Sequence, residues 1–421
     1  MTKSVRTVRL GLIGLGVVGQ GVLELLARQR ADLAQRFGIA LVPVAACVRD
    51  PKRDRGPHAG GLALESDPLA LVQRPDVDIV VELAGGLAMW PAIELALRAH
   101  KPVVTANKAL IAEKLGELVS LSQETGTPVH CEGAVAAALP ILRSLGRRVD
   151  RITQVQAILN GTSNFVLTRM EQDEMPLDKA VALAQQKGFA EADPSADIDG
   201  HDAAAKLSIL AHRALGIWSK PGTFPVRGIR ELTPADFDLA EAMGHRIRHI
   251  AHAEERPDGS AELAVEPMLL PDWHLLASVE EEYNAVYLTC ESAGDLSFFG
   301  KGAGGLPTAT AVVGDLVDVA LGTPTWWPTP NAQPLSDPAL QQRRHYVRVH
   351  GSRQLVARRI EDRLRKAGFS VQDRATCLSA GESLDLGFII GATQAGPLHE
   401  IAGQLMELEK VSSVLVLTLS E

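Results

Sequence analysis

The chain has 421 residues, 46% of them hydrophobic and 22% charged, which suits two or three globular domains with ample apolar cores. Its net charge of −9 argues against nucleic acid or an anionic membrane as the main partner, and no segment has the ~18 uninterrupted apolar residues of a membrane span. The four cysteines, Cys47, Cys131, Cys290 and Cys377, are too scattered for a metal pair or a disulfide framework, which favours a reducing, cytoplasmic location.

The first segment, residues 8–30, is typical of a buried strand, a glycine turn and an amphipathic helix. The turn has the spacing Gly14-x-Gly16-x-x-Gly19. In this spacing the first glycine permits a tight turn, the second lets the backbone approach a pyrophosphate, and the third lets the helix pack on the strand. The free N–H groups at the helix start, around Val17 and Val18, would then bind phosphate. A turn with only a packing role is the alternative.

Further β and α segments alternate along residues 39–48, 77–84, 92–100, 101–106 and 127–133. Such alternation is typical of a parallel sheet with helices on both faces. The sequence therefore predicts a Rossmann-type, doubly wound NAD(P)-binding domain over residues 1–135.

The second predicted strand ends in a basic loop, CVRDPKRDRG. An NAD site usually has an acidic residue here, which binds the ribose 2′-hydroxyl. Arg49, with Lys52 and Arg53 nearby, suits a 2′-phosphate instead and favours NADP(H). Asp50 keeps NAD(H) as an alternative, and a solvated basic loop is another.

Lys108 follows the predicted strand at residues 101–106, within the stretch TANKALIA. Ligands of doubly wound sheets bind at the carboxyl ends of the strands, so this lysine is well placed to meet a cofactor or substrate. A lysine that simply begins a surface helix is the alternative.

Residues 136–330 are predicted to form an α+β domain for substrate binding and dimerisation. Within it, NGTSNF (160–165) indicates a turn followed by a helix that Thr162 or Ser163 could cap. The N–H groups there, at Gly161 and Thr162, could hold a small carboxylate. An ordinary capped turn is the commoner alternative.

The stretch EADPSADIDGHDAAAK, residues 191–206, has five acidic residues and ends on one lysine. Pro194 predicts a loop, and a helix is expected to begin between residues 199 and 202. On that helix Asp202 and Lys206 are four apart and share one face. The alternative is a solvated loop followed by a surface ion pair worth ~0.3–0.5 kcal/mol.

These motifs together resemble homoserine dehydrogenase. GFAEADPSADIDGHDAAAKLSILA is similar to that family's signature, and the glycine turn, TANKALIA, NGTSNF and GKGAGGLPTATAVVGDL match in the same order over residues 8 to about 330. The family interconverts L-homoserine and L-aspartate 4-semialdehyde with NAD(P)H, on the route to threonine, methionine and isoleucine. The resemblance implies the same reversible reaction for this chain.

The resemblance also implies roles for individual residues. Hydride transfer to an aldehyde leaves negative charge on oxygen, which an acid must protonate. Lys206 would be that proton donor, and Lys108 would assist at the reacting oxygen or the nicotinamide. Asp202 would bind or orient the substrate near Lys206. Glu191 would hold the ammonium group of the substrate, and Asp197 would lie close to the amino acid.

Two more matches imply binding sites. The loop that begins GKGAGG brings Gly302 to the nucleotide, unless it is only a turn before an interface helix. CEGAVAAALPILRSL resembles the segment whose backbone carbonyls bind sodium or another monovalent cation. By position, the carbonyls belong to Glu132, Val135, Ala137 and Leu139. The family commonly has glycines where this chain has Ala136 to Ala138, so ligation requires that φ stays allowed there.

Residues 331–344 are polar and contain two prolines, which predicts a linker. The pattern of residues 345–421 is β-α-β-β-α-β and resembles an ACT regulatory domain, a module that often binds amino acids. Its usual D-x-P-G-like ligand loop is replaced by GSRQLV at residues 351–356. Dimer scaffolding is therefore as good an interpretation as threonine binding.

The sequence thus predicts a homoserine dehydrogenase, assembled as a homodimer or homotetramer. One alternative is another NAD(P) oxidoreductase acting on an amino acid, in which Lys206 and the carboxylates would lie away from the nicotinamide. The other is a sensor that binds an amino acid and a nucleotide without turnover.

Overall fold

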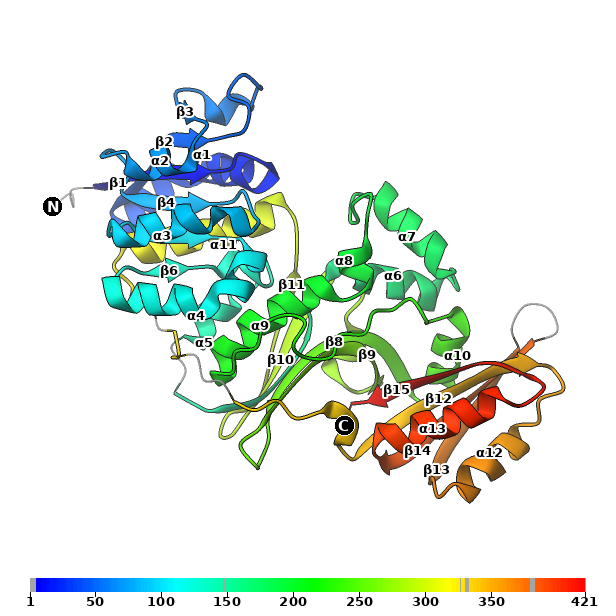
Figure 1. Cartoon of the computed structure of the whole chain (residues 1–421). Coiled ribbons are helices and arrows are strands. Elements are labelled where there is room, and N and C mark those ends of the chain that lie inside the picture. Colours follow the sequence, from blue (N-terminus) through cyan, green and yellow to red (C-terminus); the bar gives the residue numbers. More distant parts are fainter. Residues whose placement is uncertain (1–4, 147–148, 326, 330–332, 379–382, 421) are drawn as a thin grey trace.

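The computed structural model describes residues 5–146, 149–325, 327–329, 333–378 and 383–420, which form one six-stranded and one nine-stranded sheet (Figure 1). Among the described helices, none combines the length and the apolar character that crossing a membrane requires.

The six-stranded sheet is parallel throughout and has the order β3-β2-β1-β4-β5-β6. Its strands are β1 (Arg6–Ile13), β2 (Ile39–Cys47), β3 (Ala63–Glu65), β4 (Ile79–Glu82), β5 (Val103–Thr105) and β6 (Val129–His130). This order confirms the predicted Rossmann-like parallel sheet. The order in which the strands are added changes direction between β1 and β4, and doubly wound sheets bind their ligands at this point. The short β3 was not predicted, because three residues carry no recognisable period.

Helices cover both faces of this sheet. They are α1 (Val17–Phe37), α2 (Pro68–Gln73), α3 (Trp90–Arg98), α4 (Lys108–Thr125) and, from much later in the chain, α11 (Gly305–Ala320). α11 packs along α1 (Figure 1). The contact is close, because a Cβ added at Gly21 would lie 3.0 Å from the carbonyl oxygen of Gly305. The chain therefore returns to the first sheet after building the second.

The second sheet begins with five antiparallel strands in the order β11-β10-β7-β8-β9. They are β7 (Ile152–Ile158), β8 (His245–Glu255), β9 (Ala261–Pro271), β10 (Tyr283–Cys290) and β11 (Gly294–Lys301). The helices of this part are α5 (Ile141–Leu145), α6 (Gly161–Gln172), α7 (Leu177–Gln186), α8 (Ser195–Ile198), α9 (His201–Leu215) and α10 (Pro234–Ala242). α9 lies against β7 and β8.

The prediction of an uninterrupted loop at residues 191–200 was wrong, because α8 forms there. Pro194 is the N-cap of this short helix. Proline is unfavourable inside a helix but tolerated at its beginning, where its missing N–H needs no partner.

The last part of the chain has the predicted order β-α-β-β-α-β. Its elements are β12 (Arg343–Ser352), α12 (Ala357–Lys366), β13 (Val371–Leu378), β14 (Ser383–Thr393), α13 (Ala395–Met406) and β15 (Val411–Leu419). Residues 331 and 332 of the predicted linker lie outside the described residues. The ACT-like character of this part stays a prediction.

This C-terminal part is joined to the second sheet. The end of β15 pairs in parallel with β9, at Thr418 with Met268 and Leu419 with Leu269, so nine strands are continuous. The sequence did not predict this pairing, because β9 and β15 are far apart in the chain.

Glu262 on β9 holds the same junction electrostatically. Its fully buried carboxylate accepts hydrogen bonds from His252 (2.7 Å) and Arg256, and pairs with Arg343 of β12. Burial alone would raise the pKa of Glu262, but the bond and charge of His252 and the two arginines outweigh it and lower the pKa to about 2. The ionised carboxylate therefore stabilises the folded state.

Glu262→Gln tests this contribution. The folded pKa lies below the ordinary value of 4.5, so the stabilisation is present above pH 4.5 and is lost as the pH falls toward 2. We expect the variant to lose about 2 kcal/mol of unfolding free energy at pH 7, with the deficit shrinking below pH 4.5. Denaturant titrations at pH 7 and pH 3, beside the part-exposed control Glu255→Gln, measure it. An equal deficit at both pH values would contradict the account.

Candidate active site

Asp202 and Lys206 form a buried ion pair on α9. Their side chains share one helix face, and Lys206 Nζ lies 2.8 Å from Asp202 Oδ2. The same Nζ donates a hydrogen bond to the carbonyl oxygen of Leu159 at the end of β7 (2.7 Å). Only 7% of Lys206 and 8% of Asp202 are exposed, so the alternative of a solvated surface pair was wrong.

Lys108 contacts the same carboxylate from α4, a helix that covers the six-stranded sheet. It is the first residue of α4, after the carboxyl end of β5, and Asn107 caps that helix by accepting a hydrogen bond from the Leu110 N–H (3.2 Å). Lys108 Nζ forms an ion pair with Asp202 Oδ1. Helices α4 and α9 pack against each other (Figure 1). One carboxylate on α9 therefore pairs with two lysines, one on each of these helices.

These contacts shift the pKa values of Asp202 and Lys206. Burial would raise the pKa of Asp202, but the charges and hydrogen bonds of Lys206 and Lys108 outweigh it and hold that pKa below its ordinary value. For Lys206, burial is the largest effect and lowers the pKa, although the attraction of Asp202 opposes it. Asp202 is thus ionised, and the ammonium group of Lys206 releases its proton more readily than a free lysine.

Asn160 connects this pair to the acidic stretch. Its Nδ2 donates hydrogen bonds to Asp197 Oδ1 (2.7 Å) and Asp202 Oδ2 (2.8 Å). Burial, followed by the charge of Asp202, raises the pKa of Asp197 even though the Asn160 bond opposes the shift. Sequence reasoning missed this role of Asn160. The signal was an amide side chain at a strand end, beside the predicted ligand turn.

Asn160 is also the N-cap of α6, with Oδ1 accepting from the Ser163 N–H (2.8 Å). The predicted cap at Thr162 or Ser163 was therefore wrong, because Asn160 has the extended backbone that a cap requires. The Thr162 hydroxyl instead donates to the carbonyl oxygen of Phe189 (2.7 Å). A Cβ added at Gly161 would lie 2.5 Å from the Glu282 carbonyl oxygen, so a larger residue does not fit.

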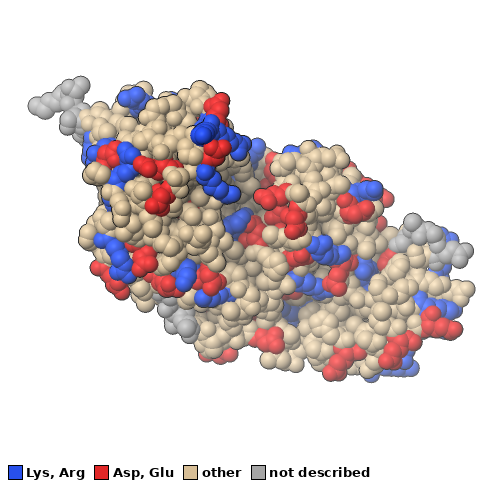
Figure 2. Space-filling view, turned by 45° about the horizontal axis from the view of Figure 1, so that its top comes forward, with Lys and Arg blue, Asp and Glu red and all other residues tan. Residues whose placement is uncertain are grey.

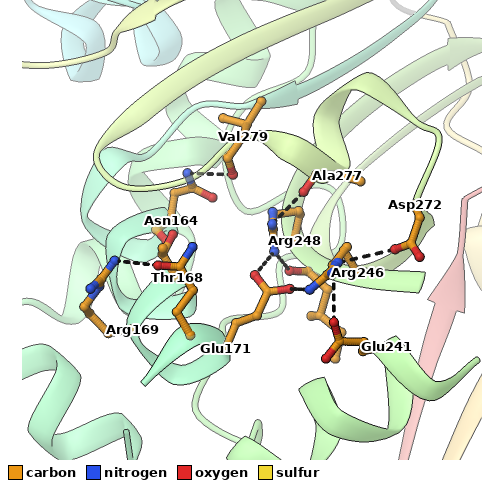
Figure 3. Close-up of polar contacts among 12 residues, drawn as sticks. Asn164, Thr168, Arg169, Glu171, Glu241, Arg246, Arg248, Asp272, Ala277 and Val279 are labelled. Carbon is orange, nitrogen blue, oxygen red and sulfur yellow. Dashed lines mark hydrogen bonds and ion pairs between the residues drawn. The ribbon is translucent and has the colours of Figure 1, made fainter. Parts of the chain in front are cut away.

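Buried polar contacts fix the rest of α6 (Figure 3). Asn164 Nδ2 donates to the carbonyl oxygens of Val279 (3.3 Å) and Glu281 (3.0 Å). Near the end of the helix, Glu171 accepts from the buried Arg248 (2.8 Å). Helix α6, which Asn160 caps, is thus attached along its length to β8 and the loop before β10.

Glu191 is not part of this cluster. It is exposed on the loop before α8, where its backbone carbonyl accepts a hydrogen bond from Gln185 (3.0 Å).

Figure 2 shows a hollow between the part formed by the six-stranded sheet and the part formed by α6 to α8, with acidic and basic side chains gathered around it.

A cavity of about 380 Å³ is lined by the side of the site that carries the two lysines. Its lining includes Lys108, Lys206, Val17, Val18, Gly302 and the backbone around Ala84. Gly302 cannot be replaced without rearrangement, because an added Cβ would lie 1.9 Å from Cγ of the buried Asn284. Five of the predicted cofactor and catalytic residues therefore surround one space.

A second cavity, of about 770 Å³, lies at the glycine turn and shares the residues 83–85 with the first. Gly14, Gly16, Arg49, Arg53 and Arg55 line it.

The glycines of the turn fit a bound dinucleotide. Gly14 has a φ of 101°, a Cβ at Gly16 would meet no atom within 4 Å, and a Cβ at Gly19 would lie 2.5 Å from the Gly14 carbonyl oxygen. Gly16 therefore leaves an open face at the start of α1, and Gly19 provides close packing, as predicted from their spacing. Two adjoining cavities on this turn suit a ligand with two connected halves.

The predicted cation loop is buried and its first residue is firmly held. The Glu132 N–H donates to Asp315 (2.8 Å), and the Glu132 carboxylate accepts from the N–H groups of Leu142 (2.8 Å) and Arg143 (2.7 Å). Ala137 has a φ of 44°, a left-handed conformation that alanine rarely adopts. The loop thus keeps a glycine-like backbone although the residue is alanine.

Comparisons with known proteins agree with this geometry. A family model described as "Homoserine dehydrogenase" matches residues 140–317, and one described as "Homoserine dehydrogenase, NAD binding domain" matches residues 14–132. The homoserine dehydrogenase of Bacillus subtilis is 39% identical over 318 residues, which are 75% of this chain and 73% of that protein. That of Pseudomonas aeruginosa is 40% identical over 321 residues, which are 75% of this chain and 72% of that protein.

The chain belongs to the homoserine dehydrogenase family.

Solved structures of the family have the same fold. A homoserine dehydrogenase from Thiobacillus denitrificans has a TM-score of 0.90 and 34% identity, covering 100% of this chain and 99% of that one. A hyperthermophilic archaeal homoserine dehydrogenase in complex with NADPH has a TM-score of 0.65 and 27% identity, covering 76% of this chain and 99% of that one. The prediction of a homoserine dehydrogenase with an NAD-binding Rossmann domain is confirmed.

Ala137→Gly tests the strained backbone of the cation loop. A left-handed alanine costs roughly 1 kcal/mol that glycine does not. We expect the variant to gain about 0.5–1 kcal/mol of unfolding free energy, measured by denaturant titration. The neighbouring Ala138, whose φ is negative, provides the control, since glycine there should be destabilising. If both variants lost stability equally, Ala137 would not be strained.

Proposed function

We propose that this chain reversibly reduces L-aspartate 4-semialdehyde to L-homoserine with NAD(P)H, and that Lys206 is the proton donor. The observation that carries the proposal is the position of Lys206 Nζ. It lies 2.8 Å from Asp202, is otherwise buried, and belongs to the lining of the cavity beside the glycine turn. A protonated amine with a lowered pKa is suited to give its proton to an alkoxide as that charge develops.

NAD(P)H, when bound, supplies the hydride. Lys206 holds the proton that the aldehyde oxygen receives, and Asp202 keeps the amine oriented toward the cavity. Lys108 would assist at the reacting oxygen or the nicotinamide, since it pairs with the same carboxylate and lines the same space. In the oxidation of homoserine the neutral Lys206 amine takes the proton back.

The substrate's amino acid end would face the acidic stretch. Asp197, which shares the Asn160 amide with Asp202, would bind the ammonium group, and Glu191 would approach it from the exposed loop. The N–H groups at Gly161 and Thr162 would hold the carboxylate at the start of α6. The hydroxyl of Thr162 is engaged with Phe189, so its backbone is the part available for this role.

NADP(H) is the proposed preference, with NAD(H) as the alternative. Gly14, Gly16, Val17, Val18 and Gly19 would bind the pyrophosphate, with Gly302 closing from the opposite loop. Arg49 would meet the 2′-phosphate in the larger cavity, where Arg53 and Arg55 add positive charge. Asp50 is less suited to the ribose, because its carboxylate accepts a hydrogen bond from the Lys52 N–H (2.9 Å).

A sodium ion, or another monovalent cation, would bind at the carbonyls of Glu132, Val135, Ala137 and Leu139. Its charge would stabilise the turn that carries the left-handed Ala137, and Val135 and Ala137 line the catalytic cavity. The cation would therefore order one wall of the site.

The remaining proposals concern assembly. We propose a cytoplasmic homodimer or homotetramer. Residues 1–135 would form the nucleotide domain, 136–330 the substrate and dimerisation domain, 331–344 a linker, and 345–421 an ACT-like regulatory domain. The β-α-β-β-α-β order of the last part supports its resemblance to an ACT domain.

The function is tested by NADPH and NADH oxidation with L-aspartate 4-semialdehyde. We expect turnover by the wild type, a higher kcat/KM with NADPH, and a fall in kcat of about 10²–10⁴-fold in Lys206→Ala. Lys220→Ala, which removes a part-exposed lysine paired with Glu113, serves as the control and should retain activity. Full activity in Lys206→Ala would move the donor role elsewhere, and a preference for NADH would overturn the role of Arg49.

A further inference from the structure

We propose that Arg348 of the C-terminal part and Arg230 are positioning residues for the substrate site, because together they set the place of α8 and hence of Asp197. This inference rests on the proposed function of Asp197. It concerns neither the chemistry at Lys206 nor ligand binding by the C-terminal part.

The first contact lies between β12 and α10. Arg348 is 5% exposed, and its guanidinium group donates to Thr233 Oγ1 (2.7 Å) and to Asp236 Oδ2. Tyr346, on the same strand, donates its hydroxyl proton to Asp236 Oδ1 (3.1 Å). Both oxygens of a fully buried carboxylate on α10 are therefore held by the C-terminal part.

These contacts act on the beginning of α10. Thr233 is the N-cap, and the N–H and hydroxyl of Thr233 donate to Asp236 Oδ2 (2.8 and 3.0 Å), the same oxygen that Arg348 binds. Arg348 thus completes the cap. Without it, a buried carboxylate would lose its cation, and the helix start would be held only by the contacts of Thr233 and Tyr346.

The connecting segment, residues 226–233, carries this position to α8. The Ile229 N–H donates to the carbonyl oxygen of Ile198 (2.9 Å). A Cβ at Gly228 would lie 2.3 Å from the same Ile198 oxygen, so the two backbones touch. Arg230 Nη2 donates to Asp199 Oδ2 (3.0 Å), and its Nε also pairs with that carboxylate.

A second attachment supports the connecting segment from the C-terminal part. Arg227 Nη1 donates to the carbonyl oxygen of Val416 on β15. The Arg227 N–H donates to the Val265 carbonyl oxygen on β9 (2.7 Å), and its own carbonyl accepts from His249 (3.0 Å). The segment is therefore fixed on both sides before it meets α8.

α8 ends at Ile198, one residue after Asp197, whose carboxylate shares Asn160 with Asp202. A shift of Ile198 and Asp199 must move Asp197 relative to the catalytic pair. The cavity at the glycine turn, where the cofactor is proposed to bind, has no lining residue from α8 or the connecting segment, and neither has the adjoining cavity beside the lysines. The arrangement predicts an effect on binding of the amino acid substrate that spares the cofactor.

The test compares Arg230→Ala, Arg348→Ala and Arg348→Lys with the control Arg344→Ala. Arg344 lies on the same strand, but its side chain bonds to Gln372 within the C-terminal part. We expect Arg230→Ala and Arg348→Ala to raise KM for L-aspartate 4-semialdehyde about tenfold, the contribution of a hydrogen bond to a charged group. KM for NADPH and kcat should change by less than about twofold, and Arg348→Lys should recover part of the loss.

A double mutant distinguishes one connected path from two separate effects. If both arginines act through α8, KM in Arg230→Ala/Arg348→Ala should be little higher than in the worse single variant. Multiplied effects would overturn the proposal, as would an unchanged KM in folded Arg348→Ala or in Arg230→Ala. Arg230 is part-exposed, so its variant is informative even if Arg348→Ala fails to fold.

Hydrogen–deuterium exchange gives a readout that needs no turnover. We expect faster exchange at residues 195–200 in Arg348→Lys and Arg348→Ala than in Arg344→Ala. Unchanged exchange there would overturn the path from β12 to α8. If the wild type fails to turn over, the proposed function fails, and the exchange result still decides whether Arg348 positions this segment.

Discussion

The site depends on one buried carboxylate, that of Asp202, which pairs with two lysines. Lys108 begins a helix at the edge of the parallel sheet, whereas Asp202 and Lys206 lie on a helix over the second sheet. A buried lysine without a partner is costly, so Asp202 is what allows Lys206 to remain charged away from water. Because Lys108 pairs with the same group, the cluster of Lys108, Asp202 and Lys206 forms only when the two parts of the chain are packed together.

Buried ion pairs also join the C-terminal part to the rest of the chain. Glu262 on β9 pairs with Arg343 of β12, and Asp236 on α10 pairs with Arg348 of the same strand. Each carboxylate is buried and each partner comes from another part of the chain, so each pair is stable only in the assembled fold. The continuous nine-stranded sheet, in which β15 pairs with β9, provides the backbone counterpart of these ion pairs.

The sequence predicted the features whose causes are local. The glycine turn, the parallel sheet, the pair of Asp202 and Lys206 at four residues' spacing and the β-α-β-β-α-β tail all follow from short-range patterns. It did not predict the contact of Lys108 with Asp202, the bridging amide of Asn160 or the pairing of β9 with β15, because these depend on how distant segments pack. The sequence did not predict α8, because a proline ends a helix when it lies in the interior but is tolerated at the start, where Pro194 stands.

The most direct test of the central claim is the pH dependence of kcat in both reaction directions. If burial beside Asp202 lowers the pKa of Lys206, reduction should slow as the pH rises through a value below the ordinary lysine pKa of about 10.4, because the donor loses its proton. Oxidation of homoserine should accelerate through the same value, because the neutral amine accepts the proton. A reduction rate that stays constant up to pH ~10.4, or the same profile in Lys206→Ala, would contradict the account.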